Sequence, residues 1–425
     1  MLFISSYSIV DGAFISNFVG TDALASINIL MPVMSLLSGI GFMFSTGGSA
    51  YVANLLGKGE PEKARRSFSL ILLVVSMISL IFTVVGFVFA DPLVELLGAG
   101  EVLEPSALEY AYGFLPFVLF LVIQFVMTQF LIVAGRPGMS LFVSVAGGLS
   151  NIFLDYLLIV VFDMGLTGAA IASGTGSLVP SIVGIVFFLN KDRELRITRP
   201  SKDMNAIVST CTNGISEMAG ELSGGITILC YNQVMMNYLG PDGVSAITIL
   251  SYVQFLALAA IIGYSNGIAP VMSYDHGSGD KEGMNKIFRF SLKFVAALSI
   301  AAFMIMELFC QQITGFFAES SDSVMDIAVY GARIFSFGFL LMGLNVYGSS
   351  LFTSLSNGPV SALISLFRSL VLLAPLIIAL PAIFGIDSVW LAVPLTELIS
   401  SFVVVYFILR YSGRYGYMKP VGSSG

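Results

Sequence analysis

Apolar stretches long enough to cross a membrane recur along the whole length of this sequence. A crossing needs roughly 20 residues, because an α-helix rises about 1.5 Å per residue through about 30 Å of hydrocarbon. Only 11% of the 425 residues are charged and 56% are hydrophobic, whereas soluble domains usually contain about 25% charged residues. The chain is therefore predicted to be an all-α integral membrane protein.

Twelve spans are predicted. The first begins at Met1 without a hydrophilic leader or a cleavage signature of small residues, and Asp11 lies within it. We therefore interpret it as a retained helix and not as a signal peptide. The predicted spans are residues 1–19, 23–55, 64–90, 106–134, 138–162, 166–189, 206–238, 243–274, 286–317, 325–355, 359–383 and 387–411.

Basic residues lie almost entirely on one side of the predicted membrane. The loops of the other side carry no Lys or Arg but many acids, which also explains the net charge of -7 and gives no reason to expect nucleic-acid binding. Because basic loops stay in the cytoplasm, both termini are predicted to be cytoplasmic. Of the 19 basic residues, those on this side are Lys58, Lys63, Arg65, Arg66, Arg136, Lys191, Arg193, Arg196, Arg199, Lys202, Lys281, Lys286, Arg289, Arg410, Arg414 and Lys419.

The sequence contains an internal repeat. Residues 17–29, "NFVGTDALASINI", align without a gap on residues 237–249, "NYLGPDGVSAITI", at an offset of 220. The same offset places "GKGEPEKA" on "GSGDKEGM" and Gly165 on Gly385. Six spans separate equivalent points, so the two halves should run through the membrane in the same sense.

The repeat predicts two pseudo-symmetric six-helix lobes. Residues 1–190 form the N-terminal lobe, 191–205 a charged cytoplasmic loop, 206–411 the C-terminal lobe and 412–425 a tail that ends in "GSSG". Internal duplication of this kind is typical of transporters, whose halves move about a site at their interface.

Acidic residues inside the spans are the first candidates for function, because a charge at mid-membrane costs roughly 2.5–3.5 kcal/mol. Asn151 and Asp155 are four residues apart and share a helix face with Gly147. The sixth span supplies Ser173 as a plausible neighbour, and the first span supplies Asp11.

Two interpretations of these acids remain open. If Asp11 and Asp155 share a pocket, both carboxylates cannot easily be ionised there, so one binds a proton or a cation lies between them. Na⁺ is one candidate at Asp11, Asn151 and Asp155. Alternatively, each acid only accepts hydrogen bonds and stabilises the helix bundle.

The second half has different polar residues. Tyr231 is found where the repeat would place Asp11. Arg368 and Glu397 on the last two spans are interpreted as a structural charge pair, because an isolated guanidinium in lipid would be untenable. Glu217 is a candidate for contacting a cationic substrate.

The sequence blocks also resemble a known family. "IVDGAFISNFVGTDALASINILMPV", "STGGSAYVANLLGKGEPEKA" and "NIFLDYLLI" are similar to the N-terminal half of MATE (multidrug and toxic compound extrusion) transporters, and "GVSAITILSYVQ" and "VWLAVPLTELIS" to the C-terminal half. "NGISEMAGE", Arg368 and Glu397 are most similar to the bacterial drug-exporting branch.

The resemblance implies twelve helices in two lobes that export organic, often cationic, compounds in exchange for inward Na⁺ or H⁺. It places the coupling site at Asp11, Asn151 and Asp155, with Ser173 where the family has Thr. It also implies a multi-pass protein of the bacterial cytoplasmic (inner) membrane that works as a monomer in the lipid bilayer.

The resulting hypothesis is multidrug antiport by alternating access, with small organic molecules as substrates. Aromatic and Met side chains suit flat apolar cations, although simple helix packing explains them equally well. The candidates for lining a substrate cavity, besides Glu217, are Met34, Met127, Tyr252 and Phe255.

Three rival functions would leave different signs in the sequence. A lipid-linked precursor flippase of a related two-lobed fold should have a strongly cationic cavity, and a channel needs no exchange mechanism between two lobes. An enzyme should show a nucleophile with a base or a metal motif, and neither is found in the sequence. Cys211, Cys230, Cys310 and His276 lack metal-ligand spacing, so no cofactor is expected and the chain is not predicted to be an enzyme.

Overall fold

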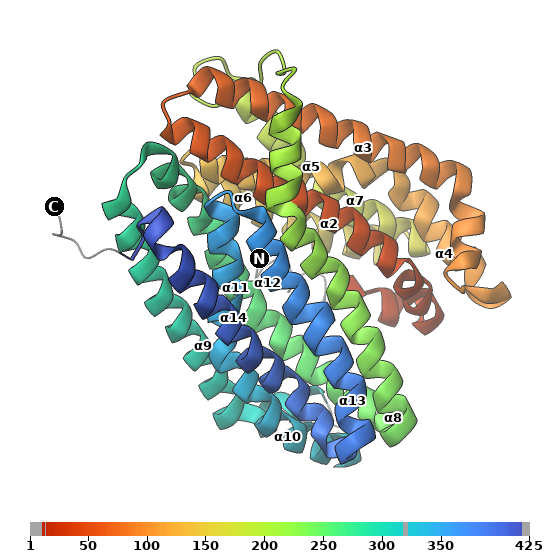
Figure 1. The fold of residues 1–425 in the computed structure, drawn as a ribbon. Helices are drawn as coiled ribbons and strands as arrows, with labels where there is room; N and C mark the ends of the chain where they lie inside the picture. Colours follow the sequence, from red (N-terminus) through yellow and green to blue (C-terminus); the bar gives the residue numbers. More distant parts are fainter. Residues whose placement is uncertain (1–10, 13, 318–321, 419–425) are drawn as a thin grey trace. The chain divides into compact units, whose positions relative to one another are not determined.

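The computed structural model describes residues 11–12, 14–317 and 322–418 (Figure 1). All regular structure in this part of the chain is helical. The elements are η1 (Ile15–Val19), α2 (Thr21–Gly57), α3 (Pro61–Leu96), α4 (Gly100–Phe114), η2 (Leu115–Phe117), α5 (Val118–Val133), α6 (Pro137–Asp155), η3 (Tyr156–Val161), α7 (Gly165–Leu189), α8 (Met204–Ser278), α9 (Lys281–Phe317), α10 (Asp322–Phe335), η4 (Ser336–Gly338), α11 (Phe339–Ser354), α12 (Gly358–Leu366), η5 (Phe367–Leu373), α13 (Ala374–Phe384), η6 (Ile386–Leu391) and α14 (Ala392–Tyr415).

The helices agree with the predicted membrane spans. Within the described residues, 10 helices are long and apolar enough to cross a membrane. One of them, α8, has 75 residues and is broken at Gly240, where φ is 66° and ψ is -156°, so it accounts for two predicted spans. The predicted first span lies mostly outside the described residues.

Backbone irregularities repeat along the chain and support the internal duplication. Gly20 and Gly240 both have positive φ, and so do Gly59 and Gly279, each with a φ of 74°. Residues with a side chain rarely adopt such angles, which explains why glycine is found at both members of each pair. The two halves therefore share backbone geometry as well as sequence.

The chain divides into two compact units, residues 1–221 and 222–425. The loop predicted to join the lobes packs onto the first unit: the Arg65 side chain donates a hydrogen bond to the Glu194 carbonyl at 2.6 Å, and the Thr198 amide donates one to Ser69 at 2.8 Å. Leu195 of the same loop is buried in the core of this unit. The unit also includes the first part of α8.

Each unit has its own apolar core. In the first unit Phe68 lies between Phe130 and Phe188, with ring centroids 4.6 Å and 4.8 Å apart. In the second unit Trp390 is fully buried against Gly331, where a Cβ atom would lie 2.7 Å from the indole ring.

Large apolar side chains are exposed on the outer face of several helices. Helix α3 exposes Met77, Leu80, Ile81, Val84 and Val88, each by more than half of its surface. Such a continuous apolar face is costly in water but stable against lipid tails. The exposed faces therefore support a multi-pass membrane protein.

Two glycines bring α2 and the first part of α8 into backbone contact within the first unit. A Cβ atom on Gly47 would lie 2.0 Å from the Thr210 carbonyl oxygen, and one on Gly214 would lie 2.0 Å from the Met43 carbonyl oxygen. Small residues of this kind permit close helix packing inside a membrane.

Replacing Gly214 with Ala is expected to destabilise this crossing by roughly 1–3 kcal/mol, because the added methyl group meets backbone atoms that cannot rotate away. Thermal melting of the detergent-purified protein measures the effect. Gly220→Ala is the matched control on the same helix, since nothing lies within 4 Å of a Cβ there. Equal melting temperatures for the two variants would contradict the close packing.

Candidate functional site

Two polar side chains are completely buried at the end of α6. Asn151 and Asp155 both have an exposed fraction of 0%. They lie one turn apart on the same helix face, as their spacing predicts. Helix α6 ends at Asp155 and continues directly as the π-helical segment η3.

Small residues bring this face of α6 against α7. A Cβ atom on Gly147 would lie 2.5 Å from the Gly176 carbonyl oxygen, and one on Gly176 would lie 3.0 Å from the Asn151 Cβ atom. The two helices therefore touch through their backbones beside Asn151. The predicted stripe of Gly147, Asn151 and Asp155 therefore lies on the face of α6 that packs against α7.

Asp11 joins the same region from the residues that precede η1. The Ser173 hydroxyl of α7 donates a hydrogen bond to Asp11 Oδ2 at 3.3 Å. The carboxyl groups of Asp11 and Asp155 are close enough to interact with one another. The structure thus brings together all four residues predicted for ion coupling, although they come from three separate segments.

Most polar atoms at this site lack a protein partner. Among the described residues, no hydrogen-bond partner is found for the buried Oδ1 atom of Asp11, the side-chain oxygen and nitrogen of Asn151, or either carboxyl oxygen of Asp155. A buried polar group without a partner typically costs about 1–3 kcal/mol. Apart from the Ser173 hydroxyl on Asp11 and the contact between the two carboxyl groups, protein hydrogen bonds therefore leave the polar atoms of this site unsatisfied.

The potential ligands of this site are oxygen atoms. Carboxylate, amide and hydroxyl oxygens are hard ligands of the kind that alkali and alkaline-earth cations prefer. Within the described part of the chain no group of three or more His, Cys, Asp and Glu residues could hold a metal ion. The site therefore offers two carboxylates and one amide, besides the Ser173 hydroxyl, as oxygen ligands.

Polar residues next to the site were missed in the sequence. Ser177 and Ser181 extend the line of Ser173 along α7, and the Gln124 side chain donates a hydrogen bond to the Ser177 hydroxyl at 3.1 Å. The hydroxyl of Ser181 donates to the Phe120 carbonyl at 2.9 Å. The four-residue spacing of these serines was a visible signal, whereas the position of Gln124 depends on the packing of α5 against α7.

Three π-helical segments lie beside ionisable residues. Segment η1 follows Asp11, η3 begins after Asp155, and η5 contains Arg368. A π-helical turn inserts an extra residue and redirects the side chains that follow, and such turns are frequent at functional sites. Here they are adjacent to the acids of the first unit and to the half-buried Arg368 of the second.

Arg368 and Glu397 form an ion pair in the second unit. The Arg368 Nε and Nη2 atoms both donate to Glu397 Oε1, at 2.9 Å and 2.6 Å. The Asn345 amide donates to Glu397 Oε2 at 2.6 Å, a contact that the sequence did not predict. The glutamate thus has partners for both carboxyl oxygens.

The candidates for a substrate cavity occupy different environments. Glu217 and Met34 are half-buried in the first unit, while Tyr252 and Phe255 are exposed on α8 in the second unit, by 42% and 51%. Met127 is fully buried in the core of the first unit. A Cβ atom on Gly184 would lie 2.5 Å from the Met127 Cβ atom, so Met127 packs closely between α5 and α7.

A family comparison identifies the chain. The family described as MatE matches residues 1–157 and 228–378, which covers both halves of the repeat and includes Asp11, Asn151 and Asp155. The chain belongs to the MATE family. The family membership predicted from the sequence blocks is thereby confirmed.

Curated relatives of this MATE protein cover nearly its whole length. The multidrug export protein MepA of Staphylococcus saprophyticus is 24% identical over 420 residues, which are 95% of this chain and 90% of the relative. MepA of Staphylococcus aureus is 23% identical over 416 residues, which are 95% of this chain and 89% of the relative.

Solved structures share the fold. A MATE protein crystallised in complex with MaL6 has a TM-score of 0.91 at 22% sequence identity, covering 97% of this chain and 93% of the other. An outward-facing multidrug resistance MATE transporter of the MOP superfamily also has a TM-score of 0.91, at 21% identity and 97% and 92% coverage. The predicted fold class, an all-α membrane protein with two six-helix lobes, is confirmed.

Proposed function

We propose that this MATE protein is a secondary active multidrug antiporter, which exports organic and often cationic compounds in exchange for inward Na⁺ or H⁺. The observation that carries the proposal is the buried pair of Asp11 and Asp155 with unpartnered carboxyl oxygens. Two acids in such a place need a positive charge to be stable. An ion whose binding depends on conformation can supply that charge and drive transport.

The relatives support drug export as the transported process. Both MepA relatives are named multidrug export proteins, and they align with 95% of this chain. We infer from this that the substrates of the chain are small organic molecules. Glu217 is the proposed contact for their positive charge, with Met34, Tyr252 and Phe255 as apolar contacts.

The proposed mechanism couples the affinity for the ion to the affinity for the drug. An ion that enters the site of Asp11, Asn151 and Asp155 neutralises the carboxylates and removes their repulsion, which favours the conformation that releases the drug outward. Drug binding from the cytoplasm favours the conformation that releases the ion inward. The coupling must be reciprocal, because each ligand changes the affinity for the other by the same factor.

A pocket at the start of α7, on the side opposite the basic loops, is the proposed entrance for the ion. It has a volume of about 350 Å³ and is lined by Gly20, Glu109 and Gly165, among others. Glu109 accepts hydrogen bonds from the amide and the hydroxyl of Thr167, both at 3.0 Å. The exposed carboxylate of Glu109 would attract cations to the start of α7, about two helical turns before Ser173.

Localisation and assembly follow from the same proposal. We place the chain in the bacterial cytoplasmic membrane with both termini cytoplasmic, because the basic loops lie on one side. It would work as a monomer in the bilayer, without a cofactor, a nucleic-acid partner or an enzymatic reaction. The flippase alternative is less favoured, since Arg368 is neutralised by Glu397 and is not free to bind pyrophosphate.

Gradient-driven efflux from proteoliposomes tests this function. Vesicles with the same ethidium concentration inside and outside are given an inward Na⁺ gradient or an inward proton gradient, and dye movement is followed by fluorescence. We expect one of the two gradients to drive efflux against the dye gradient, and dye movement to drive ion movement in return. Dye flux that only follows its own gradient would refute antiport and indicate a channel or a passive carrier.

A further inference from the structure

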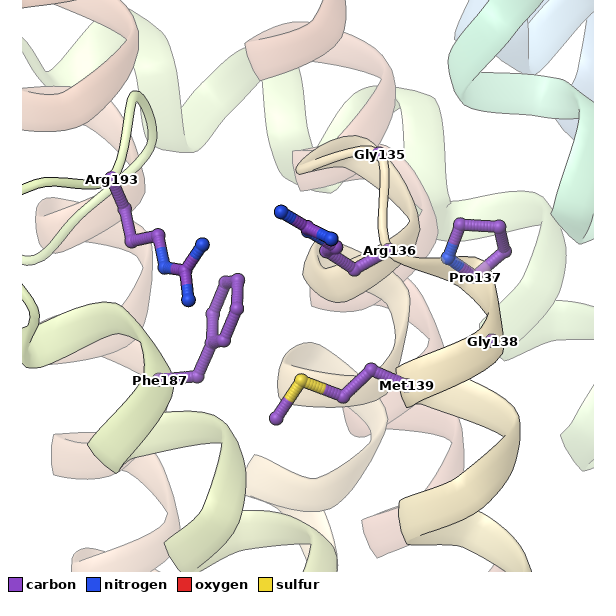
Figure 2. A pocket seen from close by; sticks show the side chains of 7 residues that line it. All are labelled: Gly135, Arg136, Pro137, Gly138, Met139, Phe187 and Arg193. Atoms are coloured by element: carbon purple, nitrogen blue, oxygen red, sulfur yellow. The ribbon is translucent and has the colours of Figure 1, made fainter.

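A second pocket lies at the basic end of the first unit, at the opposite end of α6 from Asp155. It has a volume of about 470 Å³ and is lined by residues 135–139, Phe187 and Arg193 (Figure 2). These residues come from the start of α6, the end of α7 and the loop that follows α7. None of them takes part in the proposed ion exchange.

Two guanidinium groups face this pocket. Figure 2 shows Arg136 and Arg193 pointing toward the same gap, with Phe187 and Met139 beside it. The Arg193 guanidinium lies 4.6 Å from the centroid of the Phe187 ring. Its Nε atom is buried and has no hydrogen-bond partner among the described residues.

The charges of both arginines remain uncompensated within the described part of the chain. Neither Arg136 nor Arg193 forms a salt bridge there, although Asp192 and Glu194 flank Arg193 in the loop. Two uncompensated guanidinium groups beside one cavity favour an anion. Arginine suits phosphate in particular, because its planar group can donate two parallel hydrogen bonds.

The loop that carries Arg193 is held in place by its own contacts. The Arg193 amide donates to the Asn190 carbonyl at 3.3 Å, and the Ile197 amide donates to the Phe188 carbonyl at 2.8 Å. Leu195 is 2% exposed and anchors the loop in the apolar core. The pocket is therefore pre-organised, which lowers the entropy cost of binding.

The pocket also borders an uncapped helix start and an apolar surface. Helix α6 begins at Pro137 without a side-chain cap, and the positive end of its dipole favours negative charge at this end. Leu141 and Phe142 on α6 and Val186 and Leu189 on α7 are each more than half exposed nearby in sequence. A ligand with an anionic head and apolar chains would fit both the basic pocket and the exposed apolar side chains beside it.

We propose that this pocket binds the phosphate headgroup of an anionic phospholipid at the basic side of the membrane. Arg136 and Arg193 contact the phosphate oxygens, and the acyl chains extend along the exposed side chains of α6 and α7. A lipid is favoured over free phosphate because the pocket borders a lipid-facing apolar surface, along which the acyl chains of a bound phospholipid can lie. Basic pockets between transmembrane helices on the cytoplasmic side are a recognised type of site for anionic lipid headgroups.

Native mass spectrometry of the full-length protein with added lipids tests the proposal. Phosphatidylglycerol is compared with phosphatidylcholine on the parent protein and on Arg136→Gln/Arg193→Gln. We expect bound phosphatidylglycerol to exceed bound phosphatidylcholine, and its affinity to fall roughly tenfold or more in the double variant. The control Arg199→Gln/Lys202→Gln removes the same charge from the same loop region outside the pocket and should keep the parent affinity.

Two further experiments test the pocket independently of the arginine variant and distinguish a lipid from free phosphate. Gly138→Glu places a carboxylate in an open position of the pocket wall, where nothing lies within 4 Å of a Cβ, and should also displace the lipid if the arginine variant does not fold. Inorganic phosphate at millimolar concentration should not compete with phosphatidylglycerol. Equal lipid binding by all variants would overturn the site, and full competition by inorganic phosphate would overturn its assignment to a lipid.

Discussion

Asparagine in place of Asp155 is expected to reduce ion-driven drug efflux about tenfold or more. The substitution keeps the size of the side chain but removes a carboxylate that has no hydrogen-bond partner among the described residues. Only the Asp11 carboxylate then remains, so the site holds a cation less strongly and the two conformations lose most of their difference in ion affinity. Coupling energies of about 1–3 kcal/mol correspond to roughly 5-fold to 150-fold changes. Ethidium efflux from vesicles under the driving gradient measures the loss.

Asp163→Asn is the matched control for this substitution. Asp163 is exposed and has a φ of 49°, a backbone conformation that Asn tolerates well, so this variant loses one carboxylate outside the site. Its efflux should equal that of the parent. Drug binding to Asp155→Asn in detergent should persist, which separates a coupling defect from misfolding. Unchanged gradient dependence in both Asp155→Asn and Asp11→Asn would remove Asp11 and Asp155 from the coupling mechanism.

The membrane spans could be predicted because a helix that crosses a membrane must be long enough and apolar enough to do so. Helix α6 (Pro137–Asp155) with η3, and α7 (Gly165–Leu189), begin and end within a residue or so of the predicted spans 138–162 and 166–189. Glycine and proline mark these ends, since Pro137 starts α6 and Gly165 has positive φ at the start of α7. The residues at which these helices begin are thus set by local sequence, which is why they could be predicted.

The grouping of the site residues was predictable only in part. Spacing placed Asn151 and Asp155 on one face, and the polar residues of the first and sixth spans made Asp11 and Ser173 plausible neighbours, which the resemblance to the family then supported. The π-helical turns after Asp11 and Asp155 were not predicted, because an extra residue in a helical turn depends on the packing of its neighbours. Gln124 was missed for the same reason, since its hydrogen bond to Ser177 comes from the contact between two helices.

Met127 shows why a side chain's direction could not be predicted from its type. An apolar side chain in a membrane helix can face lipid, a cavity or the core, and the spacing of apolar residues does not distinguish these when every face is apolar. The deciding residue is Gly184, which leaves room for Met127 between α5 and α7. That partner is 57 residues away in the sequence.

Removing the charge of Glu397 is expected to destabilise the protein by roughly 3–5 kcal/mol, because Arg368 would remain as an unpaired cation inside the membrane. The Glu397 side chain is 3% exposed and that of Arg368 is 22% exposed, so water can screen the pair only slightly. Glu397→Gln tests this by thermal melting of the purified protein. Glu62→Gln is the control, since Glu62 and Arg66 form an exposed pair in which loss of the contact should cost less than about 1 kcal/mol.

The double variant Arg368→Met/Glu397→Leu distinguishes a structural pair from a functional one. If the pair only stabilises the second unit, apolar side chains of similar volume should restore most of the melting temperature and leave efflux intact. Recovery of stability without recovery of efflux would instead assign Arg368 or Glu397 a direct part in transport. Failure of the double variant to regain stability would show that Asn345, which donates to the Glu397 carboxylate at 2.6 Å, needs that acceptor as much as Arg368 does. The structural interpretation therefore depends on rescue by two apolar residues, a result that no single substitution can give.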